Sequence, residues 1–372
     1  MCSQLLNGFL SARGIRTRVY YDRSARVGEY LRALLPGGKV LLLADQAHAS
    51  LSAAIKADLA GFKVISVVYG EKDRPEGLFS LPDDVRGTVA VGERSALAAR
   101  FFTTLRGGYC ILLPVRASAR GIFERSIETC GEYPLCDADA VIADELLMKT
   151  DAAEIAECAL SSLFAEDIDI DGAFTGRRKE DAGYGQLRAA QKFLCAEEIG
   201  AKDLFNASAC LALARACNFR FPADAFLSLL IQRSGKDRGA CALETLLFFT
   251  KKYSYLFNDG HLRPFYVADY AARAQRAAET IGKRAFSLIA VPSLRESFER
   301  ERVFAESRRR FCDAMRLLSD FADVVKEKYY AAGGKRGAFG EDLLNELFSF
   351  SADLSPFLSV GALMRDFGVR CA

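Results

Sequence analysis

Histidine, the side chain that most often serves acid–base catalysis near neutral pH, occurs only twice in the 372 residues, as His48 and His261. Neither can be assembled by spacing into a Ser/His/Asp or Cys/His set. A lone histidine is more often a surface or hydrogen-bonded structural residue than a catalyst. The sequence therefore predicts no nucleophilic triad.

A second pattern with chemical potential is the acidic run Glu-Asp-Ile-Asp-Ile-Asp at residues 166–171, which Gly172 follows. Its three aspartates match the first half of a calcium-binding loop, in which side-chain oxygens alternate along the chain. The position that should carry the closing glutamate is Arg178, so the match fails. The run is instead expected to be a helix exit or a loop.

Short apolar runs in the first 145 residues indicate β-strands that are buried on both faces. Helix-patterned segments at 51–59 and 95–105 alternate with them. This βαβ order predicts a doubly wound, mostly parallel, Rossmann-like sheet, whose ligands bind beyond the carboxyl ends of the strands. The five runs are residues 40–44, 64–68, 87–91, 109–113 and 140–143.

After about residue 150, apolar residues recur at helical spacing and almost nothing has the pattern of a strand. We therefore expect an α/β domain over residues 1–148 and an all-helical domain over residues 149–372. A flexible loop is expected at 331–337, which is rich in glycine. The predicted helices of the second domain are residues 152–163, 185–195, 204–216, 225–231, 240–253, 267–281 and 304–330.

The bulk composition excludes several classes of protein. Lys and Arg total 50 against 48 for Asp and Glu, so the chain has no concentrated basic field for nucleic acid or a membrane surface. No stretch approaches the roughly 20 apolar residues of a membrane span, and the N-terminus has no secretion-signal pattern. The 11 scattered cysteines lack a C-x-x-C pair, which favours reduced thiols in a cytoplasmic protein.

Several segments, taken in order, resemble the iron-containing alcohol dehydrogenase superfamily, which includes dehydroquinate synthase. The glycerol-1-phosphate dehydrogenases look nearest. The resemblance rests on the order and spacing of the segments, because no single motif is intact. The matching segments are residues 18–45, 84–100, 113–122, 139–147 and 357–368.

The resemblance implies a dehydroquinate synthase-like fold, in which the α/β domain binds NAD or NADP and the helical domain carries a divalent metal. It also implies an ancestral NAD(P)-dependent oxidoreduction of a small polyol or polyol phosphate, with the metal polarising the substrate oxygen. Self-association is a further expectation, because the family commonly forms oligomers. The cofactor positions carried over from the family are Asp45, Gly92, Glu93, Arg94, Ser95, Pro114, Arg116, Ser118 and Arg120.

The turn that would hold the pyrophosphate departs from the family's Gly-Gly-Gly-Ser and reads Gly92-Glu-Arg-Ser95. Backbone amides approach a pyrophosphate best in a turn without Cβ atoms, and Glu93 adds negative charge where the phosphates would lie. Arg94 could offset that charge, and Arg120 replaces an aspartate of the family's next loop, with Arg116 nearby. Either arginines hold a dinucleotide here, or the charged side chains of the turn face solvent.

Asp45 stands at the end of the first predicted strand and is the residue closest to the family pattern. It could accept hydrogen bonds from an adenosine ribose. It could equally cap the next helix.

The metal ligands that the resemblance implies are largely missing. Glu157 falls near the family's carboxylate, but residues 240–247, where a histidine should stand, contain none and offer only Glu244 and Cys241 as ionisable groups. The family's His-Gly motif looks most like Asp259-Gly260, followed by His261. Glu157, Asp259 and His261 could hold an ion only with a changed geometry, so no metal is expected. Otherwise Glu157 is a solvated helix residue, and the other two lie in a turn.

Three hypotheses about function remain open. The first is a divergent member of the superfamily that has lost metal-dependent catalysis and serves ligand sensing or assembly. The second is an active NAD(P)-dependent reductase with a rearranged or absent metal site. The third is a non-catalytic protein that binds a nucleotide or another small anion through Arg94, Arg116 and Arg120, and it requires these arginines to converge.

Overall fold

The computed structural model describes residues 2–128, 132–175, 183–217, 221–258 and 294–353, together with Gln275 and Glu279. The chain divides into two units. The first comprises residues 1–151 and 195–216, and the second comprises 152–194 and 217–372. The sequence places the boundary at 148/149 and does not indicate that 195–216 belongs with the first unit.

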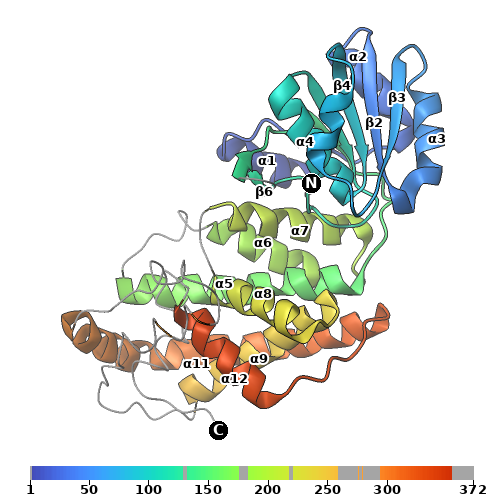
Figure 1. The fold of residues 1–372 in the computed structure, drawn as a ribbon. Coiled ribbons are helices and arrows are strands. Elements are labelled where there is room, and N and C mark those ends of the chain that lie inside the picture. Colours follow the sequence, from blue (N-terminus) through green and yellow to red (C-terminus); the bar gives the residue numbers. More distant parts are fainter. Residues whose placement is uncertain are drawn as a thin grey trace. The chain divides into compact units, whose positions relative to one another are not determined.

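A six-stranded parallel sheet with the strand order β1-β8-β5-β4-β2-β3 forms the centre of the first unit (Figure 1). This topology confirms the predicted doubly wound α/β fold. The strands are β1 (Arg18–Tyr20), β2 (Lys39–Asp45), β3 (Lys63–Tyr69), β4 (Val85–Val91), β5 (Tyr109–Leu113) and β8 (Ala140–Ile142), and a separate antiparallel hairpin is made by β6 (Ser126–Glu128) and β7 (Glu132–Pro134).

Helices cover both faces of this sheet. The alternate side chains Val40, Leu42 and Ala44 of β2 form a buried cluster with residues of α2 and α3. Because successive strand residues point to opposite faces, Leu41 and Leu43 lie on the other face, and both are fully buried. Burying each of these leucines contributes about 1.5–3 kcal/mol. The helices of the unit are α1 (Cys2–Ala12), α2 (Val27–Leu34), α3 (Ala49–Asp58), α4 (Glu93–Arg106) and α7 (Ala201–Arg215).

The two edges of the sheet differ from the sequence-based expectation. Strand β1, which no apolar run indicates, closes one edge, and the Asn7 side chain of α1 pairs with its backbone. The Asn7 Oδ1 accepts a hydrogen bond from the Val19 amide at 2.9 Å, and its Nδ2 donates to the Val19 carbonyl at 3.1 Å. At the other edge, β3 is only partly buried, with Val68 51% exposed. The prediction that this strand is buried on both faces was therefore wrong, because in the described sheet β3 is an edge strand that pairs with β2 alone.

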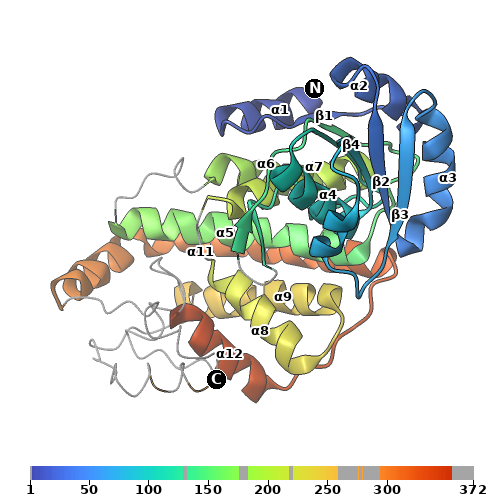
Figure 2. The same cartoon turned by 45° about the horizontal axis from the view of Figure 1, so that its top comes forward.

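The described part of the second unit is entirely helical, which confirms the predicted all-α domain. Helices α5, α9 and α11 pack against one another (Figure 2). The predicted helix 267–281 and the segment 357–368 lie outside the described residues, apart from Gln275 and Glu279. The helices are α5 (Ala152–Thr175), α6 (Tyr184–Leu194), α8 (Pro222–Ser234), α9 (Arg238–Asn258), α11 (Leu294–Ala331) and α12 (Glu341–Asp353).

The acidic run 166–171 lies inside helix α5, so the predicted loop was wrong. Its acidic side chains have partners that let them be buried in a helix. The Arg188 Nη2 lies 2.7 Å from Glu166 Oε1 and 2.9 Å from Asp169 Oδ2, and the Tyr253 hydroxyl donates to Asp167 Oδ1 at 2.7 Å. The sequence alone does not reveal these partners.

No helix in the described ranges is long and apolar enough to cross a membrane. Eight cysteines of the same ranges form no disulfide, as expected for reduced thiols. Four of them are buried and behave as small apolar side chains in the core.

Candidate functional site

The carboxyl ends of the neighbouring strands β2 and β4 bring Asp45 against the turn that begins helix α4. Asp45 Oδ1 accepts hydrogen bonds from the Ser95 amide at 2.7 Å and from Ser95 Oγ at 2.5 Å, and Oδ2 accepts one from the Arg94 amide at 3.3 Å. Asp45 therefore caps α4, not the next helix along the chain. The expectation that Asp45 caps the next helix was therefore wrong, because a contact between the ends of two strands has no signature in the local sequence.

Gly92 is the one residue of this turn whose lack of a side chain the geometry requires. Its φ of +106° suits glycine, and a Cβ added there would lie 2.2 Å from Asp45 Oδ2. The Gly92 amide donates to the Leu113 carbonyl at 3.2 Å. The amides of Gly92, Arg94 and Ser95 are thus all used within the protein.

The charge at this helix start is unfavourable for a bound anion. The Asp45 carboxylate occupies the donors that attract phosphate to a helix N-terminus, and Glu93 is the first residue of the same helix. A phosphate brought within 4 Å of a carboxylate near the surface is repelled by about 4 kcal/mol per pair of unit charges. That repulsion exceeds what one helix terminus contributes, typically about 0.3–1 kcal/mol.

Arg94 and Arg116 are bound to different parts of the first unit. The Arg94 Nη2 donates to the Glu71 carbonyl at 2.5 Å, just beyond β3, whereas the Arg116 Nη1 lies 3.3 Å from Asp151 Oδ2. Strands β3 and β5 are separated by β2 and β4, which corresponds to roughly 14 Å at the usual strand spacing. The convergence that an arginine-held anion requires is not supported by these contacts.

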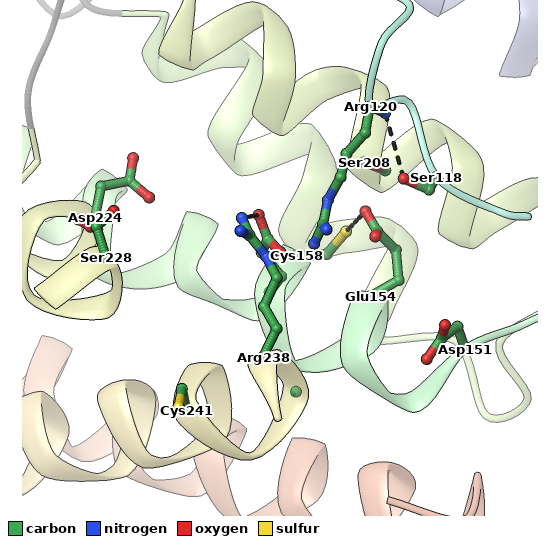
Figure 3. A network of polar contacts seen from close by, with 12 residues as sticks. Ser118, Arg120, Asp151, Glu154, Cys158, Ser208, Asp224, Ser228, Arg238 and Cys241 are labelled. Atoms are coloured by element: carbon green, nitrogen blue, oxygen red, sulfur yellow. Dashed lines mark hydrogen bonds and ion pairs between the residues drawn. The ribbon is translucent and has the colours of Figure 1, made fainter. Parts of the chain in front are cut away.

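The loop after β5 is braced by its own hydrogen bonds. Ser118 is buried, and its Oγ accepts a hydrogen bond from the Arg120 amide at 3.3 Å (Figure 3). The Ala119 amide donates to Ser208 Oγ of α7 at 2.9 Å. Pro114 at the start of the loop is also buried. Ser118 and Pro114 are therefore parts of the packing of this unit.

Arg100, which the sequence analysis missed, binds backbone carbonyls of the chain that follows this loop. Its guanidinium is buried and donates to the backbone carbonyls of Cys136, Gly121 and Glu124 at 2.8, 3.0 and 2.7 Å. Burial lowers the pKa of this arginine. The available signal was its position in α4 between Ala99 and Phe101, where a solvated arginine would be unexpected.

In the second unit, Glu157 forms a bidentate ion pair with Arg238. Its side chain is 2% exposed, and its two oxygens accept from the Arg238 Nε at 2.7 Å and the Nη2 at 2.8 Å. Arg238 extends from the first turn of α9, as Figure 3 shows. The next residue, Gly239, makes this approach feasible, because a Cβ there would lie 2.7 Å from the Ala153 Cα of α5. The alternative of a solvated Glu157 was wrong.

The described residues do not fit the divalent metal of the resembled family. Both Glu157 oxygens face a guanidinium, which supplies the positive charge that a metal would bring. A neighbouring acid, Glu154, accepts a weak hydrogen bond from the Cys158 thiol at 3.7 Å (Figure 3). No group of three or more His, Cys, Asp or Glu in the described ranges could hold a metal ion. Asp259 and His261 lie outside those ranges.

Glu244 is the acid of residues 240–247, the segment expected to supply a second metal ligand. It lines a groove of the second unit. This groove of about 720 Å³ lies between α9, α11 and the loop after α11, and Lys326 and Arg336 also line it. Burial raises the pKa of Glu244, and Arg336 opposes that shift. Glu244 therefore lines this groove, whereas Glu157 is paired with Arg238.

No protein-family model matches this sequence, and a search of curated proteins finds no relative. Among solved structures, glycerol dehydrogenase from Schizosaccharomyces pombe is similar with a TM-score of 0.52 and 15% identity, over 92% of this chain and 95% of that one. Maleylacetate reductase from Agrobacterium tumefaciens has a TM-score of 0.51 and 14% identity, over 95% of each chain.

An iron-containing alcohol dehydrogenase from Thermococcus thioreducens has a TM-score of 0.51 and 14% identity, over 96% of this chain and 99% of that one. At such identities the likeness concerns the fold. The chain therefore has the two-domain fold of the iron-containing alcohol dehydrogenase superfamily, as the sequence resemblance predicted.

Proposed function

We propose that this protein is a non-catalytic member of the dehydrogenase-fold group, in which metal-dependent hydride transfer has been lost. The observation that carries the proposal is the bidentate pair of Glu157 with Arg238. A metal could use this carboxylate only if the guanidinium left it. The Arg238 side chain is 43% exposed and that of Glu157 is 2% exposed, so losing this charge-assisted pair costs about 1.5–3 kcal/mol, less than the loss of a fully buried pair.

The contacts of Asp45 at the expected cofactor site support the same proposal. The Asp45 carboxylate takes up the amides of Arg94 and Ser95 that a pyrophosphate would use at the start of α4. A dinucleotide held there would have to displace Asp45 and leave its charge without those donors. Both contacts disfavour the reaction. The Glu157–Arg238 pair opposes binding of the metal that would polarise the substrate, and the Asp45 contacts oppose binding of the dinucleotide that would donate the hydride.

A second candidate is an NAD(P)-dependent reductase that works without a metal. It is favoured by the similar folds, because the structures with TM-scores above 0.5 are named as glycerol dehydrogenase, maleylacetate reductase and iron-containing alcohol dehydrogenase. It requires Asp45 to release the α4 amides when nucleotide binds.

An activity assay on the full chain distinguishes the two candidate functions. NADH and NADPH oxidation would be followed with dihydroxyacetone, glyceraldehyde and short aldehydes, in chelator, in zinc and in iron(II). We expect no oxidation above the enzyme-free rate in any condition. Turnover that requires a metal would overturn the proposal, and turnover that persists in chelator would establish the metal-free reductase.

A further inference from the structure

Strand β3 has an unpaired outer edge in the described structure. It lies at one end of the sheet and pairs with β2 alone (Figure 1). The Lys63 amide donates to the Gly38 carbonyl at 3.0 Å, so the backbone groups of Lys63 face β2. Because successive residues of a strand direct these groups to alternate sides, those of Val64, Ser66 and Val68 face outward. None of the three makes a hydrogen bond with another described residue on that side.

The two edges of the sheet are protected differently. At the β1 edge, the amide and carbonyl of Val19 are bound by the Asn7 side chain. In β3, residues 64–68 read Val-Ile-Ser-Val-Val and contain neither a charge nor a proline. Exposed strand edges of natural proteins commonly carry such residues, which prevent pairing with another chain. The β3 edge therefore has the character of a pairing surface.

Side chains next to this edge are accessible. Val68 is 51% exposed, and Ser66 is exposed as well. Val64, on the same face of the strand, packs against the buried cluster that contains Ile55 and Leu59 of α3. Helix α3 therefore covers the beginning of the strand on this face and leaves its second half open.

The sequence of β3 is self-complementary about its central residue, Ser66. In an antiparallel pair of two copies with the two-fold axis at Ser66, Val64 of one copy faces the partner's Val68. On the opposite face of the sheet, Ile65 faces the partner's Val67. Apolar and β-branched cross-strand pairs of this kind stabilise a sheet.

The charges at the ends of the strand are compatible with the same arrangement. Lys63, the one charged residue of β3, faces the partner's Tyr69, so no like charges oppose each other. Glu71, two residues beyond Tyr69, brings a negative charge to that corner. Lys63 and Glu71 are exposed, and neither side chain has an ion pair with another described residue.

We propose that two copies of this chain associate through β3 in an antiparallel pair with its two-fold axis at Ser66, so that their sheets join into one. The pair of Ser66 residues and the two Val64–Val68 pairs have their backbone groups turned toward the partner, and each pair exchanges two N–H···O bonds. Such a contact uses the same surface of both copies, so it closes at the dimer.

The length of the strand sets the expected strength of this dimer. Seven residues span roughly 23 Å at about 3.3 Å per residue. Stable interfaces bury about 1,200–2,000 Å² in total, and a strand pair of this length with its flanking side chains is at the low end of that range. We therefore expect association in the micromolar range. The resemblance to an oligomeric family named no surface, and this proposal does not depend on the proposed function.

Sedimentation velocity of the full chain over about a 100-fold range of concentration tests the proposal. We expect a monomer–dimer equilibrium, with a dissociation constant that Ser66→Pro raises by about 10-fold or more, because proline removes the amide at the two-fold axis. An edge strand accepts proline where the N–H faces solvent, so the monomer should remain folded. Ser66→Ala is the matched control, because it keeps the amide and should leave the constant within about 2-fold of the unmodified protein.

Val68→Glu gives a second variant that acts through a side chain. It should also weaken the dimer, whereas Leu105→Glu should not, because Leu105 is a similarly exposed apolar residue (53%) at the end of α4. Thermal unfolding checks that each variant is folded.

A monomer at every concentration would overturn the proposal. A dimer that neither Ser66→Pro nor Val68→Glu weakens would show that another surface is used and would overturn it too, as would Ser66-dependent species larger than a dimer. These variants leave the Asp45 and Glu157 contacts in place, so either proposal can fail without the other.

Discussion

At the scale of single residues, the proposal depends on two acids, Asp45 and Glu157. The sequence resemblance assigns them as a ribose-binding and a metal-binding carboxylate. Each instead makes charge-assisted hydrogen bonds within its own unit. Such bonds are roughly twice as strong as neutral ones, so both residues act here as structural ties.

The coupling energy between Glu157 and Arg238 can be measured with a double-mutant cycle. Arg238→Met removes the bidentate partner of the buried Glu157 carboxylate and should lower the free energy of unfolding by about 2 kcal/mol, whereas the double variant Glu157→Met/Arg238→Met should recover much of that loss. Urea denaturation gives the four values. A cycle with no coupling, below about 0.5 kcal/mol, would mean that the pair is not formed in solution.

Asp167 should make stability depend on pH. Burial raises its pKa from 3.8 to about 8, against the opposing effect of the Tyr253 hydroxyl. The native state therefore keeps Asp167 protonated while the unfolded chain releases that proton above about pH 4. With more protons bound in the native state, stability falls as pH rises from about 4 to about 8, by at most about 1.4 kcal/mol per pH unit.

Asp167→Asn removes this titration but keeps an acceptor for Tyr253. It should therefore stabilise the protein at pH 8 and have a smaller effect at pH 5, in thermal unfolding measured at both pH values. Asp320→Asn, at an exposed position of α11, is the matched control. An equal effect of Asp167→Asn at the two pH values would show that the carboxyl is ionised in the fold.

Sequence reasoning proposed site positions but could not predict the contacts that these residues make. The order and spacing of segments led to Asp45, the turn at Gly92 and Glu157. Their partners could not be predicted: Arg238 is 81 residues from Glu157, and Ser95 is 50 residues from Asp45. Contacts of this length depend on packing, which a single sequence does not encode locally.

At the scale of elements, the strands were the easiest to predict. The continuous apolar runs of β2, β4 and β5 identify central strands because both of their faces are buried. Strand β1 has three residues, of which Arg18 is exposed, so it carries no such pattern. Helix α5 continues through acids that look like a terminus, because Arg188 and Tyr253 compensate them.

Arg100 links helix α4 to the loop before β6 and the loop after β7, so its replacement tests how the first unit is held together. Arg100→Lys keeps the charge but cannot donate to the carbonyls of Cys136, Gly121 and Glu124 at once. We expect a loss of about 3 kcal/mol in urea denaturation and faster proteolysis of residues 114–139. Arg86→Lys should change neither, and equal behaviour of the two variants would contradict the structural role of Arg100.

At the scale of the whole molecule, the chain shares its fold with the dehydrogenase structures, and our proposal is that the polar contacts at the expected sites differ from those of an active enzyme. Fold similarity at 14–15% identity rests on the placement of buried apolar residues. Activity depends on a few polar side chains, which can be replaced while the core is retained. This is why the sequence predicts the fold well and the chemistry poorly.

The most direct test of the central claim is a fluorescence titration of the full-length protein with NADH and NADPH. Each titration is repeated with zinc. With Asp45 holding the α4 amides, we predict no saturable signal up to about 1 mM, the upper end of ordinary enzyme affinities. Saturable binding that zinc tightens would contradict the account, because it would require both the helix start and Glu157 to be available to ligands.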